Sequence, residues 1–284
     1  MKQLNSKCSL CISTYNWPAA LYHCLLSVKN QTLLPKEVII ADDGSTNETA
    51  LIIDEIRKTF PIPIIHVWQK DEGFKLAAIR NKSCAKATGE YIIQSDADVI
   101  LHPNFIQDHL RFAKKNTFVS GARCMLNKEF SENILTQHTN PTVKQMLQHC
   151  TKKYNGLRIP ILSYANYYLQ QGIAQTKYVL GVNMAFYKED LLAVNGYNEE
   201  FTGWGKEDND IAVRLFMHEI KIRVIKLGAN LYHIHHKGAD GKQLEVNDLL
   251  YKLILSLEDG ELLNAADNVA TFVVPSYAND TLDK

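Results

Sequence analysis

The sequence predicts an α/β fold with a mostly parallel sheet flanked by helices. Short apolar segments of strand length alternate with segments of helical length through the first hundred residues. The expected strands are residues 8–13, 37–41, 62–68 and 91–93, and the expected helices are residues 19–29, 47–58 and 75–87. This alternation is typical of parallel sheets, because each parallel connection needs a crossover that is usually helical.

Polar clusters follow three of the expected strands. They are Ser-Thr-Tyr-Asn at 13–16, Asp-Asp-Gly-Ser at 42–45 and Asp-Ala-Asp at 96–98. Open α/β sheets bind ligands at the carboxyl ends of their strands. The three clusters therefore predict a ligand site along one edge of the sheet.

The second half of the chain has a weaker pattern. Residues 127–175 give no clear assignment beyond acceptor-side loops and helices, and the tyrosine-rich stretch 154–168 is interpreted as part of a lid. Order returns with an expected strand within 178–187 and a helix at about 208–218. We predict one domain over residues 1–240, with halves at about 1–125 and 126–240, and a helical extension at 241–284. Within this extension, residues 244–257 are expected to form a helix with four leucines on one side: Leu249, Leu250, Leu253 and Leu257.

Composition and charge exclude several classes of protein. Hydrophobic residues make up 46% of the 284-residue chain and charged residues 22%, which is ordinary for a globular enzyme. The net charge of zero creates no strong field, so no nucleic acid is expected as a partner. Neither a secretory signal nor an apolar stretch of about 18 residues is apparent. We expect a cytoplasmic enzyme, with peripheral contact at the inner face of the membrane as a further option.

Two clusters contain candidate metal ligands. The carboxylates of Asp96 and Asp98 share one face of a strand, or converge if the chain turns there, and such oxygen ligands suit Mn²⁺ or Mg²⁺ carrying a diphosphate. Acidic residues after a strand also cap helices, so this pair alone is a weak signal. His233 and His236 are three residues apart, a common spacing of metal ligands, with His235 between them. A histidine trio without metal is the alternative interpretation.

The segment Gly-Trp-Gly-Lys-Glu-Asp at 203–208 contains a candidate acceptor site. The indole of Trp204 can stack on the apolar face of a pyranose ring, and a carboxylate beside it can take a proton from a hydroxyl. The alternative is a helix cap, with Asp208 at the N-cap and Trp204 in the core.

Taken together, these segments resemble family 2 glycosyltransferases. The clusters at 13–16, 40–45 and 95–98 look like the nucleotide-binding half of that family. Residues 69–74 and 78–81 are similar to chondroitin-polymerase-like members, and residues 181–186, 203–208 and 233–236 look like the half shared with β-1,4-galactosyltransferases. The motifs occur in the order of the family between residues 8 and 237. The resemblance implies a GT-A type fold, with residues 1–125 binding the nucleotide sugar and residues 126–240 forming the acceptor half.

The resemblance also implies roles for residues in the nucleotide half. Tyr15 is expected to stack on a uracil and Asp43 to accept from its N3–H group, in a pocket also lined by Ser13 and Asp42. Arg80 is expected to support the nucleotide or the diphosphate. Asp96 is expected to contact the ribose side of the donor.

Further roles follow for the metal and the acceptor half. Asp98 and His236 are expected to bind the metal, with His233 where β-1,4-galactosyltransferases have a methionine. Because His235 is an extra histidine, the choice among the three histidines stays open. Asn183 is expected to contact the donor sugar. Trp204 and Glu207 are expected to hold the acceptor, and Asp208 is expected to be the catalytic base.

The function expected from the resemblance is an inverting transfer of a hexose, N-acetylhexosamine or glucuronic acid. The donor is a UDP-sugar with Mn²⁺ or Mg²⁺, and the acceptor is a saccharide or lipid-linked saccharide in polysaccharide or glycoconjugate synthesis. The alternatives are another diphosphate-handling enzyme, such as a nucleotidyltransferase, and a non-catalytic carbohydrate-binding protein. The C-terminal helix is expected to pack on the domain, with pairing to a second subunit or contact with a membrane as alternatives.

Overall fold

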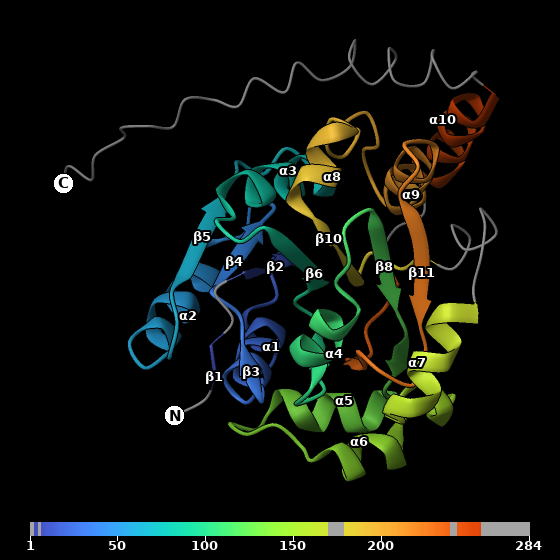
Figure 1. Cartoon of the computed structure of the whole chain (residues 1–284). Helices are drawn as coiled ribbons and strands as arrows, with labels where there is room; N and C mark the ends of the chain where they lie inside the picture. The colour runs from blue at the N-terminus through green and yellow to red at the C-terminus, as the bar shows by residue number, and fades with distance from the viewer. Residues whose placement is uncertain (1–2, 5–6, 170–178, 239–242, 257–284) are drawn as a thin grey trace.

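The computed structural model describes residues 3–4, 7–169, 179–238 and 243–256, and its centre is a seven-stranded sheet (Figure 1). The strand order is β11-β8-β10-β6-β2-β4-β5. The bounds are Cys8–Thr14 (β2), Glu37–Asp42 (β4), Ile64–Trp68 (β5), Tyr91–Asp96 (β6), Thr117–Gly121 (β8), Asn183–Tyr187 (β10) and Lys221–Ile225 (β11). The predicted α/β fold is confirmed.

The sheet is parallel except at one strand. β6, β2, β4 and β5 run parallel to one another, whereas β10 pairs antiparallel with both β6 and β8. The parallel part comes from the predicted strand–helix alternation, and its strands begin and end within three residues of the expected bounds. The expected strand within 178–187 is shorter, because only Asn183–Tyr187 pairs with neighbours.

Helices cover both faces of the sheet. One face packs against α1 (Pro18–Lys29), α2 (Asn47–Arg57) and α4 (Phe105–Phe112). The other packs against α3 (Leu76–Lys86), α8 (Lys188–Ala193) and α9 (Glu207–Met217). Alternate strand residues point to opposite faces, so Leu10 and Ile12 belong to the first core and Cys11 to the second. Both faces are buried, as the continuous apolar strands predict.

A second, three-stranded sheet lies beyond the end of β6. It consists of β7 (Val99–Leu101), β12 (Leu231–His233) and β9 (Arg123–Met125), with β12 in the middle. The unassigned region contains α5 (Lys128–Leu135), α6 (Val143–His149), a 3₁₀ turn (Lys153–Asn155) and α7 (Pro160–Leu169). A short pair of strands, β1 (Gln3–Leu4) and β3 (Leu33–Leu34), completes the sheets. None of the helices in these described ranges is long and apolar enough to cross a bilayer.

The predicted C-terminal helix is α10 (Leu244–Ser256), and it packs on the domain. The prediction that the leucine stripe forms the packed face is wrong. Leu250 and Ile254 pack against Phe201, whereas Leu249 is 67% exposed. Leu253 is exposed as well, and Leu257 lies outside the described residues.

One polar side chain ties α10 to the loop that carries Trp204. Asn247 is 1% exposed, and its amide donates to the carbonyls of Thr202 (3.0 Å) and Gly205 (2.9 Å). Because this buried amide makes its hydrogen bonds to the loop, it holds the loop against the helix.

We expect Asn247→Ala to lower the free energy of unfolding by about 1–3 kcal/mol, because two hydrogen bonds from a buried amide to the loop are lost. Urea unfolding followed by circular dichroism measures it. The matched control on the same helix is Leu249→Ala, which should change the free energy by about 0.5 kcal/mol or less. Equal stability of the Asn247→Ala variant and the wild type would contradict this account of the loop.

Candidate active site

A cavity of about 740 Å³ opens at the carboxyl end of β6 and β2. Its walls contain residues from both halves of the chain. Most of the predicted site residues line it, namely Ser13, Tyr15, Asp43, Arg80, Asp96, Asp98, Trp204, Glu207, Asp208, His233 and His236. The structure thus brings together residues that lie more than two hundred positions apart in the sequence.

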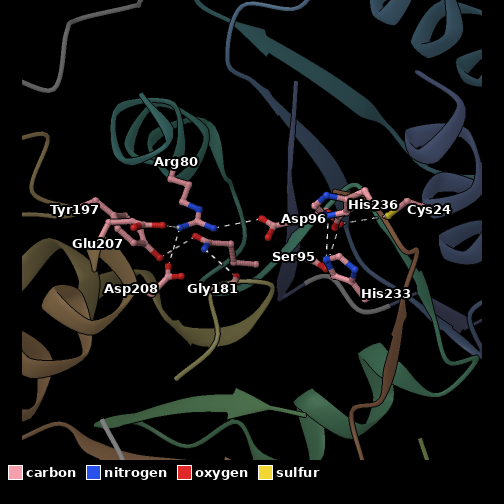
Figure 2. A network of polar contacts seen from close by, with 12 residues as sticks. Cys24, Arg80, Ser95, Asp96, Gly181, Tyr197, Glu207, Asp208, His233 and His236 are labelled. Carbon is pink, nitrogen blue, oxygen red and sulfur yellow. Dashed lines mark hydrogen bonds and ion pairs between the residues drawn. The ribbon is translucent and has the colours of Figure 1, made fainter. Parts of the chain in front are cut away.

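Asp98 and two histidines meet on one side of the cavity. The Asp98 Oδ2 atom lies 3.2 Å from His233 Nε2 and 3.0 Å from His236 Nε2 (Figure 2). The pairing of β12 with β7 produces this arrangement, since His233 lies opposite Val99 and Ile234 N donates to Asp98 O. His235 is outside the cluster, and its backbone N–H donates to Ser131 Oγ.

These three side chains fit a divalent metal ion. One ligand atom from each lies within 4.8 Å of the others, and Asp98 Oδ1 is buried without a hydrogen-bond partner among the described residues. Burial acts to raise the pKa of Asp98, but hydrogen bonds to His233 and His236 outweigh it and hold that pKa below its ordinary value. Carboxylate and imidazole together suit Mn²⁺ and related ions.

Arg80 holds three carboxylates on the other side of the cavity. It is 1% exposed on α3, and its guanidinium lies 2.7 Å from Asp208, 3.2 Å from Asp96 and 3.5 Å from Glu207. Figure 2 shows Arg80 between Asp96 and the Glu207–Asp208 pair. Arg80 lines the cavity as expected, and its terminal nitrogens contact the three carboxylates. Its expected support of the nucleotide stays a prediction.

Burial changes the protonation of two of these carboxyl groups. Desolvation raises the pKa of Glu207 to about 7 and that of Asp96 to about 6, although the charge of Arg80 opposes both shifts. Glu207 Oε2 is also buried without a hydrogen-bond partner among the described residues. Near neutral pH, Glu207 is therefore partly protonated and can donate a hydrogen bond to a ligand oxygen.

The loop before α9 presents Trp204 to the cavity. Gly203, Gly205 and Lys206 have positive φ angles of 71°, 108° and 79°, and Trp204 is 47% exposed between them. The alternative of Asp208 as N-cap with Trp204 in the core is therefore wrong, since α9 begins at Glu207 with Lys206 before it. The exposed indole beside two carboxylates is a suitable surface for a sugar ring.

Tyr15 and Asp43 line the cavity near the ends of β2 and β4. The hydroxyl of Tyr15 donates to Asp71 Oδ2 (3.0 Å), and Asp43 Oδ2 accepts from Lys75 N (2.9 Å). The neighbouring Asp42 does not line this cavity, which corrects that expectation. It faces the opposite side of the sheet, because successive strand residues alternate, and lies 2.8 Å from His66 Nε2 beside a smaller cavity.

Asn183 is another correction, since it does not line the cavity. It is fully buried, and its amide nitrogen donates to Ala122 O and Ala229 O (both 2.9 Å). Its Oδ1 lies 2.8 Å from His109 Nε2. All of its polar atoms are used in joining β10 to neighbouring segments, so its role here is structural.

Sequence reasoning missed Arg123. This residue on β9 is half-buried and lines the cavity close to His236. The hydrogen bond to Asp98 raises the pKa of His236, and the charge of Arg123 opposes that shift. It has no carboxylate in ion-pair contact within the described part of the chain. The only signal in the sequence was its position just after the apolar segment 117–121, in a region whose pattern was too weak to interpret.

Comparison with known proteins agrees with this geometry. Residues 9–172 match the family described as Glycosyl transferase family 2, and residues 163–237 match the N-terminal domain of galactosyltransferase. Chondroitin synthase of Escherichia coli is 26% identical over 95% of this chain, and hyaluronan synthase of Pasteurella multocida is 25% identical over 95%. The matches cover 42% and 30% of those synthases, so the chain spans less than half of their length.

Solved structures show the same fold at low sequence identity. Residues 1–349 of Staphylococcus aureus TarS in complex with UDP-GlcNAc give a TM-score of 0.60 at 16% identity, covering 92% of this chain and 72% of that one. The mannosyltransferase PcManGT of Pyrobaculum calidifontis, solved with GDP-Man and Mn²⁺, gives 0.54 at 17% identity, with 93% and 73% covered.

The fold and the site define a glycosyltransferase with a GT-A fold. The family match covers more than half of the residues, and the chain belongs to glycosyl transferase family 2. The expected family, the GT-A fold and the class of enzyme are confirmed, and neither a nucleotidyltransferase nor a non-catalytic binding protein is supported.

The backbone of Gly181 lies close to the side chain of Asp208. A Cβ atom on Gly181 would overlap the carboxylate of Asp208. If Asp208 takes part in the reaction, as the resemblance implies, we expect Gly181→Ala to displace it and to lower kcat about 100-fold, because a displacement of about 1 Å at a reacting group costs that much.

Steady-state kinetics of sugar transfer, with nucleotide affinity measured separately, check this prediction. Gly238→Ala is the matched control, because Gly238 lines the same cavity and its added Cβ would meet no atom within 4 Å. Unchanged kcat in Gly181→Ala, or an equal loss in both variants, would contradict the placement of Asp208.

Proposed function

We propose that the chain transfers a sugar from a UDP-sugar to a saccharide hydroxyl, with inversion at the anomeric carbon. The observation that carries this proposal is the position of two clusters on opposite sides of one cavity. Asp98, His233 and His236 form one of them, and the carboxylates held by Arg80 form the other.

The donor end of the cavity supports a nucleotide diphosphate. Tyr15 offers an exposed ring for a base, Asp43 offers a carboxylate for a ring N–H, and Ser13 lies beside them. Arg123 supplies a positive charge near the histidines, suited to a diphosphate. TarS has been solved with UDP and with UDP-GlcNAc, and we transfer the uridine nucleotide to this chain on that basis.

The metal triad fits the same end. When bound, Mn²⁺ or Mg²⁺ neutralises charge on the leaving diphosphate as a Lewis acid. Asp98, His233 and His236 would hold it. Asp96 remains the candidate contact to the ribose side, and its ion pair with Arg80 fixes the orientation of its carboxylate.

Asp208 is the proposed base. An acceptor hydroxyl resting on Trp204 would lose its proton to Asp208 while its oxygen forms a bond to the anomeric carbon. The bond from that carbon to the diphosphate breaks in the same step, so the configuration inverts. Glu207, with a pKa of about 7 and an unpaired oxygen, is suited to hydrogen-bond a second acceptor hydroxyl.

The synthase relatives suggest the biological setting. Two of them are named for polysaccharides, chondroitin and hyaluronan. We therefore propose a role in polysaccharide or glycoconjugate synthesis, with a saccharide or lipid-linked saccharide as acceptor.

The metal assignment is tested by calorimetry with UDP, with and without Mn²⁺. We expect Asp98→Ala and His236→Ala to lose the gain in UDP affinity that Mn²⁺ gives the wild type, since each removes a ligand. His235→Ala is the control beside them and should keep that gain, because His235 lies outside the triad. Full Mn²⁺ dependence in Asp98→Ala would remove the triad from the mechanism. A parallel titration with GDP checks the nucleotide, and tighter binding of GDP than of UDP would contradict the assignment of a UDP-sugar as donor.

The assignment of the base is tested by Asp208→Asn. We expect this variant to bind UDP as the wild type does and to lose about 10²–10⁴-fold in transfer rate, the usual contribution of a general base. Glu200→Gln replaces an exposed carboxylate on the segment before α9 and should transfer at the wild-type rate. Near-normal transfer by Asp208→Asn would require another base.

A further inference from the structure

Helix α7 is fixed to the domain by one narrow face. Ser163 and Tyr167 are its buried residues. The ring of Tyr167 stacks on Phe112 with centroids 4.7 Å apart, and its hydroxyl donates to the carbonyl of Phe112 (3.3 Å). Figure 1 shows α7 at the margin of the molecule beside β11.

The outward side of α7 is apolar, the reverse of an ordinary surface helix. Ile161 and Leu169 are 83% and 82% exposed. We define the α7 face by its exposed residues Ile161, Leu162, Tyr164, Ala165, Tyr168 and Leu169. At 3.6 residues per turn, these positions span an arc of about 160°. A helix that is apolar on its outward side is normally covered by another surface.

The chain segment that leads into α7 and the loop at the start of the helix carry positive charge. The sequence from Asn133 to Leu169 contains no Asp or Glu. Lys152 and Lys153 are exposed shortly before the helix. Lys226 is exposed next to Leu227, whose carbonyl accepts from Ile159 N at the start of α7. An apolar helix face flanked by lysine-bearing segments is complementary to a surface that is apolar inside and negative outside.

We propose that the α7 face binds an anionic lipid surface. Leucine and isoleucine would enter the acyl boundary, the tyrosines would lie at headgroup level, and the lysines would contact the negative headgroups. The other exposed apolar helix, α10, fits this occupant poorly, because Leu249 there lies beside Asp248 and Glu245. This inference does not depend on the identity of the donor or acceptor.

The test is flotation of the full chain with vesicles of phosphatidylglycerol and phosphatidylcholine, against vesicles of phosphatidylcholine alone. We expect wild-type binding to the anionic vesicles only, weakened by high salt. Ile161→Ser with Leu169→Ser should lower the affinity about tenfold or more, since two large apolar side chains are lost from the interface. Lys152→Gln with Lys153→Gln should lower the affinity and reduce its salt dependence.

Leu249→Ser on α10 is the matched control and should bind vesicles like the wild type. The α7 substitutions are exposed, so unchanged thermal unfolding and UDP affinity would show that the fold is kept. Absence of wild-type binding to anionic vesicles overturns the proposal, as does equal binding by the α7 double variant. A wild-type dimer that becomes a monomer in that variant, without lipid binding, would instead assign the face to self-association.

Discussion

The buried guanidinium of Arg80 is the interaction on which the rest of the site depends. It comes from α3, contacts Asp96 at the end of β6 and reaches Asp208 and Glu207 at the start of α9. Arg80 and Glu207 are buried and Asp96 and Asp208 are partly buried, so the cluster is stable only because opposite charges are in direct contact. Removing one partner from such a buried pair typically costs about 3–5 kcal/mol. The cluster therefore couples α3 and β6 in the first half of the chain to α9 in the second half.

The second constraint is the small sheet beyond β6. Asp98 lies between β6 and β7, and the antiparallel pairing of β7 with β12 brings His233 beside it. His236 follows three residues later and packs its ring edge against Trp17, with centroids 5.4 Å apart. A candidate metal centre is thus built from two distant segments by ordinary strand pairing, with no long loop needed to bring them together.

The parts of the fold that could be predicted are those where the sequence alternates regularly between strand-like and helix-like segments. The first four strands and three helices alternate regularly, and the polar residues at their ends could be assigned to one edge of the sheet by topology alone. The triad Asp98, His233 and His236 was expected from residue type and spacing, although His235 could be excluded only once the pairing of β12 was known.

Other features depend on which way a side chain points. Asp42 and Asp43 are adjacent, yet only Asp43 reaches the main cavity, because neighbouring strand residues face opposite sides. Asn183 looks like a ligand contact in the sequence but is consumed by internal hydrogen bonds. The packed side of α10 and the cavity position of Arg123 depend on tertiary contacts that no local pattern contains.

The most direct test of the central claim is UDP release from a panel of UDP-sugars, without acceptor, in Mn²⁺ and in EDTA. Metal-assisted transfer from a UDP-sugar predicts slow release of UDP from one donor in Mn²⁺ and none in EDTA. Release that is equally fast in EDTA would contradict the role of the triad. The absence of both release and UDP binding across the panel would contradict the assignment of the donor.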